Sequence, residues 1–150
     1  MAKSKSKSKT SVKLEKKAEI LTVSGKRKTA IAKATIKAGT GIIKVNKKPL
    51  EIYPYFQRLT LLEPIRIAQE TLKELPYDIA VVVTGGGVEA QAEAARLSIA
   101  KALVAFTKSA ELKNAFNAYD WSLLVADVRR KEAYKPGDSR ARAARQKSYR

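Results

Sequence analysis

The charge of this 150-residue chain is distributed so unevenly that only its middle can build a hydrophobic core. Residues 1–17 carry seven lysines and one acid, and residues 129–150 carry nine lysines or arginines and two acids. Residues 18–128 hold fifteen basic and eleven acidic residues, so thirteen of the seventeen net positive charges lie in the two ends. Such segments repel themselves and bury too little apolar surface to order alone. We therefore predict a folded α+β domain over 18–128 between a disordered Lys/Ser arm and an extended basic tail, with a polyanion, foremost a nucleic acid, as partner.

The composition argues against several other classes of protein. The chain has no cysteine and no histidine, which removes disulfides, thiol chemistry, the commonest general base and the commonest metal ligand. We expect no catalytic residue, no cofactor and no bound metal. No apolar run is long enough to span a membrane, and no apolar stretch follows the cationic N-terminus, so we expect a cytoplasmic protein.

Residue periodicity divides the middle of the chain into strands and helices. Strands are expected at 20–23, 29–38, 42–46 and 79–83, and helices at 55–74 (interrupted by Pro64), 88–109 and 111–118. Together they predict a two-layer sandwich, a mixed four-stranded sheet with helices on one face.

Three details of this sheet follow from the pattern. In 29–38, alanines and Ile36 fall in one phase and lysines and threonines in the other, which predicts a strand with one buried and one wet, cationic face. The glycines around Thr40 predict a hairpin that pairs 42–46 antiparallel with 29–38. The apolar run 79–83 is typical of a central strand covered on both faces.

Lysines and one arginine gather where the first strands meet, and we expect them to merge into one RNA-binding surface that spans several phosphates. The cluster at the mouth of the first hairpin continues along the wet face and onto the next strand: Lys26, Arg27, Lys28, Lys33, Lys37, Lys44, Lys47 and Lys48.

The glycine-rich turn 85–87, between a strand and a helix, has three readings. It resembles a dinucleotide-binding fingerprint, but no second strand with a terminal acid follows about twenty residues later. It could be a tight strand-to-helix turn, or a backbone site in which Gly86 and Gly87 receive an RNA phosphate.

Aromatic residues and the C-terminal tail complete the candidate sites. Tyr53, Tyr55, Phe56 and Trp121 are expected in the core, whereas Tyr149 has no apolar neighbours and is expected to stack on a base or sugar. Small residues separate the cations of the tail, so it could enter a narrow RNA space. Its expected RNA contacts are Arg129, Arg130, Arg140, Arg142 and Arg145.

Taken together, several segments resemble small-subunit ribosomal protein nine, in its archaeal and eukaryotic branch. The resemblance covers about residues 20–150, and the carrying stretches are Gly25–Ala30, Gly41–Asn46 with Pro49–Glu51, Leu62–Pro64, Gly85–Val88 with Gln91, Leu123–Asp127 with Arg129 and Arg130, and Gln146–Arg150.

The resemblance implies a non-enzymatic structural constituent of the small ribosomal subunit. It implies a fold like the second domain of ribosomal protein five and a place in the head of the subunit, bound to ribosomal RNA beside proteins seven, ten and fourteen, and not as a homo-oligomer. It also implies that the tail reaches the anticodon region of peptidyl-site tRNA through Lys147, Ser148, Tyr149 and Arg150. Two rivals predict different behaviour: an architectural protein that binds arbitrary duplexes, and a nucleotide-dependent enzyme that uses the glycine turn.

Overall fold

The first two strands form a hairpin: β1 (Leu21–Arg27) pairs antiparallel with β2 (Ala30–Ala38). The computed structural model describes residues 20–73, 75–137 and 140–142, so the predicted arm at 1–17 lies outside the described residues. In β2, Ala30, Ala32, Ala34 and Ile36 are fully buried and the residues between them face outward, which confirms the predicted alternation.

The sheet has five strands rather than the predicted four, in the order β1-β2-β5-β3-β4. The short β3 (Ile43–Val45) and the two-residue β4 (Lys48–Pro49) form a hairpin whose turn residues, Asn46 and Lys47, both have positive φ angles. That backbone twist suits a two-residue connection between antiparallel strands.

The predicted hairpin between β2 and β3 is wrong, because β5 (Tyr77–Thr84) lies between these strands. It pairs antiparallel with β2 and parallel with β3. Asp78, near the start of β5, accepts hydrogen bonds from the amides of Thr40 (2.9 Å) and Ile42 (3.1 Å) and so fixes the crossover. These two bonds lower the pKa of Asp78 below its ordinary value. The bond from the Ile42 amide contributes most, and the bond from the Thr40 amide contributes next.

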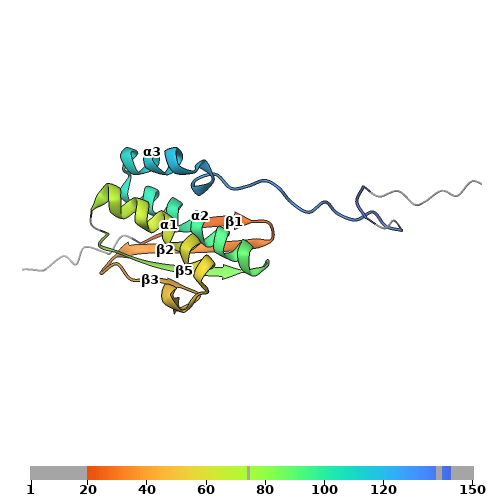
Figure 1. Cartoon of the computed structure of the whole chain (residues 1–150), viewed down its shortest axis with the longest axis horizontal. Coiled ribbons are helices and arrows are strands. Elements are labelled where there is room, and N and C mark those ends of the chain that lie inside the picture. The colour runs from red at the N-terminus through yellow and green to blue at the C-terminus, as the bar shows by residue number, and fades with distance from the viewer. Residues whose placement is uncertain (1–19, 74, 138–139, 143–150) are drawn as a thin grey trace, which may run out of the picture.

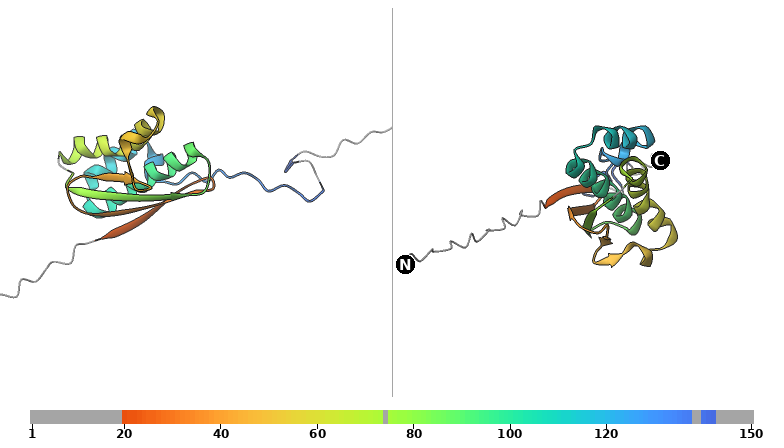
Figure 2. Two further views of the ribbon diagram at one scale, coloured as in Figure 1. Left: turned by 90° about the horizontal axis from the view of Figure 1, so that it is seen from below. Right: turned by 90° about the vertical axis from the view of Figure 1, so that its left-hand side faces the viewer.

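β5 is central in the sheet, as predicted, but it is covered on one face only. Ile79, Val81 and Val83 are buried, whereas Ala80 is exposed and 57% of Val82 is accessible. The three α-helices of the described residues lie on the other side of the sheet, as the views in Figures 1 and 2 show. The outer face of the sheet is therefore open.

Two long helices cover the inner face of the sheet. α1 (Tyr55–Leu72) follows the short helix η1 (Leu50–Ile52), and α2 (Val88–Thr107) packs against β1, β2 and α1. Pro64 is buried inside α1 and does not interrupt it, contrary to the prediction. Since α2 buries six alanines, it can lie close to the sheet.

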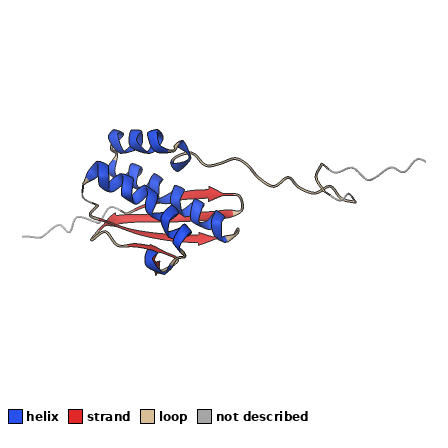
Figure 3. Ribbon diagram, in the orientation of Figure 1, coloured by secondary structure: helices blue, strands red, loops and turns tan. Residues whose placement is uncertain are grey.

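α3 (Ala110–Tyr119) and η2 (Trp121–Leu123) complete the domain. Leu112, Phe116 and Leu123 are fully buried and fasten both elements to the helical layer. Beyond η2, the described residues 126–137 and 140–142 form neither helix nor strand and run away from the body (Figure 3).

Several side chains predicted in the core are exposed. The accessible fractions are 70% for Tyr55, 77% for Phe56 and 63% for Trp121. Tyr53 is partly buried, as expected, and its hydroxyl donates to the carbonyl oxygen of Val45 (2.8 Å). The misplaced residues stand at the first turn of a helix, where little of the core is within reach.

Candidate nucleic-acid interface

Lysines line the open face of the sheet, which we call the lysine face: the outward residues of β1, β2, β5 and β3. Strand register places Lys33 opposite Ser24 and Val82, and Lys26 opposite Ile31. The lysines on this face are Lys26, Lys33, Lys37 and Lys44. Asp78 is the acid among the outward positions of these four strands, and its Oδ2 lies 3.9 Å from the Nζ of Lys37.

Four of the eight cations predicted to form one surface share this face, although by a different route from the predicted one. Lys44 faces outward from β3, in register with Ala80 of β5 rather than with a residue of β2. Since neighbouring strands are about 4.8 Å apart, two strand spacings separate Lys44 from the lysines of β2, or about 10 Å. Lys47 and Lys48 lie at the β3–β4 turn beyond it and are exposed. Small residues of β5 form the floor between the two groups of cations.

Arg27 does not belong to the lysine face. Its side chain is 17% accessible and points into the helical layer, where it makes ion pairs with Glu93 of α2 and with Asp127. The hydrogen bond with Glu93 is the main cause that raises the pKa of Arg27. Lys28, at the tip of the same hairpin, is exposed and has a φ of 50°.

The glycine turn between β5 and α2 packs against the β1–β2 hairpin. A Cβ on Gly86 would lie 2.8 Å from the Cβ of Ala30, and one on Gly85 would lie 2.7 Å from the carbonyl oxygen of Thr29. Both glycines also have positive φ. The close approach of the hairpin and the backbone conformation therefore explain why glycine stands at these two positions. Gly87 is exposed, has no atom within 4 Å of a Cβ position, and precedes the first turn of α2.

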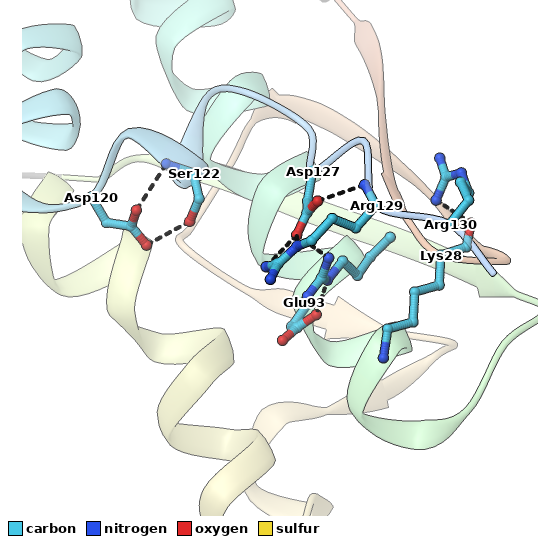
Figure 4. A network of polar contacts seen from close by, with 8 residues as sticks. Lys28, Glu93, Asp120, Ser122, Asp127, Arg129 and Arg130 are labelled. Atoms are coloured by element: carbon cyan, nitrogen blue, oxygen red, sulfur yellow. Dashed lines mark hydrogen bonds and ion pairs between the residues drawn. The ribbon is translucent and has the colours of Figure 1, made fainter. Parts of the chain in front are cut away.

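A polar cluster fixes the residues that begin the C-terminal tail (Figure 4). Oδ1 of Asp127 accepts from the amide of Arg129 (2.7 Å), and Oδ2 accepts from Nε (2.8 Å) and Nη2 (2.7 Å) of the same residue as well as from Arg27. These bonds, those of Arg129 foremost, hold the pKa of Asp127 well below its ordinary value. Arg130 donates to the carbonyl oxygen of Lys28. We call Asp127, Arg129 and Arg130 the tail root.

Beyond the tail root, the described tail residues make local contacts. The Nζ of Lys131 lies 4.5 Å from the ring centroid of Tyr134, and the Nε of Arg142 donates to Glu132 (2.8 Å). Arg140 is exposed. The remaining predicted tail contacts, Arg145, Lys147, Ser148, Tyr149 and Arg150, lie outside the described residues.

Residues 20–73, 75–137 and 140–142 contain no group of acids that could hold a metal ion. In the same part of the chain, no helix is both long and apolar enough to cross a membrane.

The sequence pattern did not single out three residues that organise this surface. Asp78 fixes the crossover beside the lysine face, while Glu93 and Asp127 bind Arg27 from positions 66 and 100 residues away. Asp127 itself is a local signal, because an Asp side chain often accepts a hydrogen bond from the backbone amide two residues later, here that of Arg129. Glu93 carries no such local signal.

Comparison with known proteins identifies the family. The family model described as "Ribosomal protein S9/S16" matches residues 25–150. The "Small ribosomal subunit protein uS9" of the archaeon Methanococcus maripaludis (strain C5) is 50% identical over 129 residues, which cover 84% of this chain and 95% of that protein. The proteins of the same name from Thermoplasma volcanium and Thermoplasma acidophilum are 49% and 50% identical over 127 residues, covering 84% of this chain and 95% and 97% of those proteins. These matches confirm the resemblance inferred from the sequence motifs: the chain belongs to the ribosomal protein S9/S16 family, in its archaeal branch, and is a ribosomal protein rather than an enzyme.

Proposed function

We propose that this protein is a structural constituent of the small ribosomal subunit, and that its lysine face binds ribosomal RNA. Family membership and the names of its relatives support the first part. The observation that carries the second part is the sorting of charge in the sheet: four lysines and one acid face outward, whereas Arg27 is neutralised inside the helical layer.

The geometry of the lysine face suits a phosphate backbone better than a base edge. Flexible lysine side chains rise on both sides of a floor made by Ala80 and Val82, which offer no hydrogen-bonding side chain. Such a surface can neutralise several phosphates and release their counterions without reading sequence. Lys28, Lys47 and Lys48 extend the same field beyond the two ends of the sheet, and Gly87 leaves free access to the N-terminus of α2.

The finer assignments rest on the family resemblance. We place the protein in the head of the subunit, in the cytoplasm, beside proteins seven, ten and fourteen. The α+β body resembles the second domain of ribosomal protein five in kind. The tail beyond residue 130 contributes arginines to RNA, and its last residues, Lys147 to Arg150, contact the anticodon region of peptidyl-site tRNA.

Binding by the lysine face is tested by the salt dependence of association with small subunits that lack this protein. The triple variant Lys33→Ala, Lys37→Ala, Lys44→Ala should reduce the log–log slope by about two units, because each phosphate contact contributes about 0.7–0.9. The matched control takes three exposed or half-buried lysines from the helical layer, Lys101 on α2, Lys108 directly after α2 and Lys113 on α3, and should leave the slope near that of the unaltered chain. Equal slopes for the two triple variants would refute the proposed face.

The role of the tail is tested on assembled subunits. Removal of residues 147–150 deletes two cations and should weaken tRNA binding at the peptidyl site while subunit assembly stays intact. Removal of residues 2–5, which also deletes two cations, is the charge-matched control and should leave tRNA affinity unchanged. Unaltered tRNA affinity after removal of 147–150 would overturn the tail assignment without affecting the lysine face.

A further inference from the structure

The tail root is bound to two elements that lie far from it in the sequence. Arg27 at the end of β1 pairs with Asp127, and the carbonyl oxygen of Lys28 in the following turn accepts from Arg130. Glu93 on α2 holds the other side of the Arg27 guanidinium. The tail is therefore joined to the β1–β2 hairpin directly and to α2 through Arg27.

Asp127 is the centre of this arrangement. Its side chain is 20% accessible, and its two oxygens accept four contacts, three from Arg129 and one from Arg27. The Arg129 amide contact closes a local turn, while the Arg27 contact ties that turn to the body. Val128, between Asp127 and Arg129 in the sequence, is 87% accessible and makes little contact with the domain. The position of this segment is consequently set by polar contacts to Asp127 and Arg130, not by burial of its own apolar side chain.

We propose that Asp127 is a positioning residue for the basic tail: it fastens the tail root to the body, so that the tail leaves the domain in one direction before any RNA is bound. A tail that leaves in a fixed direction samples a smaller volume, which lowers the entropy lost when its far end reaches a binding site. This inference concerns the free protein and holds whether or not the tail contacts tRNA.

The absence of cysteine from the chain makes the test direct, because two introduced cysteines carry the spin labels without competition. One label goes at Asn117→Cys, exposed on α3, and the other at Ala133→Cys, exposed beyond the tail root. Electron–electron distance measurement on the full chain in the absence of RNA should give a narrow distribution. Asp127→Asn should broaden it, because the segment is then held to the body by the Arg130 contact alone. Where that contact opens, the six residues 128–133 have an r.m.s. end-to-end distance of about 13 Å.

The matched control is Glu132→Gln, which removes the same charge from the tail beyond its root and disturbs the Arg142 contact instead. It should leave the distribution as narrow as that of the labelled parent. Arg27→Gln should also broaden the distribution, because it removes the contact that ties Asp127 to the body. The double variant should broaden it no further than Asp127→Asn does, since Asp127→Asn already removes that contact. A merely structural role for Asp127 predicts a lower melting temperature with an unchanged distribution.

Hydrogen exchange on the unaltered chain provides a measurement that does not depend on any variant folding. The Arg129 amide, bonded to Asp127, should exchange at least about ten times more slowly than an unstructured amide of the same local sequence. An unprotected Arg129 amide, a broad distribution in the labelled parent, or equal widths for Asp127→Asn and Glu132→Gln would each overturn the proposal.

Discussion

Gly25 should be among the least replaceable residues of the body, because α2 lies directly against it. A Cβ built at this position would be 2.4 Å from the carbonyl oxygen of Ala94, 2.7 Å from the amide nitrogen of Ser98 and 3.0 Å from the Cβ of Ser98. Ordinary contact begins at 3.4 Å, so Gly25→Ala requires α2 to withdraw by about 1 Å at its closest point. The obstacle is helix backbone, which cannot turn aside as a flexible side chain can.

The energetic cost follows from this withdrawal. A gap of 0.5–1 Å removes about a quarter to a half of the dispersion attraction across it, and overpacking in a core costs about 1–3 kcal/mol. The shift would also lengthen the contact between Arg27 and Glu93, which neighbours Ala94 on α2. We expect Gly25→Ala to lower the free energy of unfolding by about 1–3 kcal/mol and the melting temperature by roughly 4–12 °C.

Circular dichroism during urea and thermal unfolding measures this loss, since the single tryptophan is too exposed to report on the core. The control is Ser24→Ala, the neighbouring position on the outward face, where we expect a change within about 0.5 kcal/mol. If Gly25→Ala is as stable as Ser24→Ala, then α2 is not held at this distance from β1 and the reasoning fails.

Three further predictions test the lysine face, the glycine turn and the crossover. Lys33→Ala should reduce the log–log salt slope of RNA binding by about 0.7–0.9 in filter binding, whereas Lys113→Ala on α3 should not; equal slopes would contradict this. Gly86→Ala, at a φ of +70° and 2.8 Å from the Cβ of Ala30, should cost about 1–2 kcal/mol in urea unfolding, and Gly87→Ala less; the reverse order would contradict the packing argument. The pKa of Asp78 is lowered in the folded state, so its carboxylate stabilises the fold above the ordinary value of 3.8 and loses this effect as pH falls through the lowered value. The melting temperature of Asp78→Asn should accordingly lie below that of the unaltered chain at pH 6 and approach it below about pH 4; a gap independent of pH would contradict the role of the charge.

The sequence predicted elements whose pattern is local. In β2, the alternation of alanine with lysine and threonine gave the buried and wet faces correctly, because side-chain direction in a strand has a period of two. The helical periodicity of α2 gave its extent to within two residues. Both inferences need only neighbours in the chain.

Pairing between strands could not be predicted in the same way. The glycines around Thr40 suit a hairpin, and nothing in that stretch shows that β5, almost forty residues later, takes the place beside β2. The deciding contact is the Asp78 carboxylate with the amides of Thr40 and Ile42. The alternation of β5 was hidden for a related reason: Ala80 and Val82 are apolar although they face outward, so a strand with one covered face resembled a fully buried one.

In the candidate site too, the residues placed by local pattern were predicted and those placed by distant contacts were not. Lys26, Lys33, Lys37 and Lys44 lie on one open face because strand register puts outward residues together, so the prediction grouped these four correctly despite the wrong pairing. Arg27 was grouped with them by sequence proximity, but Gly25, Arg27 and Ala30 alternate to the inner side of the hairpin. Its ion pair with Asp127 spans 100 residues, and no local pattern indicates it.

The half-buried arginines of the body lie in the helical layer, whereas the lysines of the lysine face lie on the opposite side of the sheet. In the helical layer Arg96 contacts Glu63 (2.5 Å) and Asp120 (2.8 Å), and Arg27 contacts Glu93 and Asp127, so these half-buried arginines meet acids within the fold. On the open face of the described strands, the acid beside the lysines is Asp78, which lies near Lys37. We therefore expect a polyanion to favour the open face of the sheet, where four lysines stand beside one acid, although the net charge of the body is small. Because Asp127 is bound to the inner side of the β1–β2 hairpin, the same hairpin carries lysines on one side and the tail root on the other. RNA bound to the lysine face would thus orient the tail as well, because the β1–β2 hairpin contacts both the RNA and the tail root.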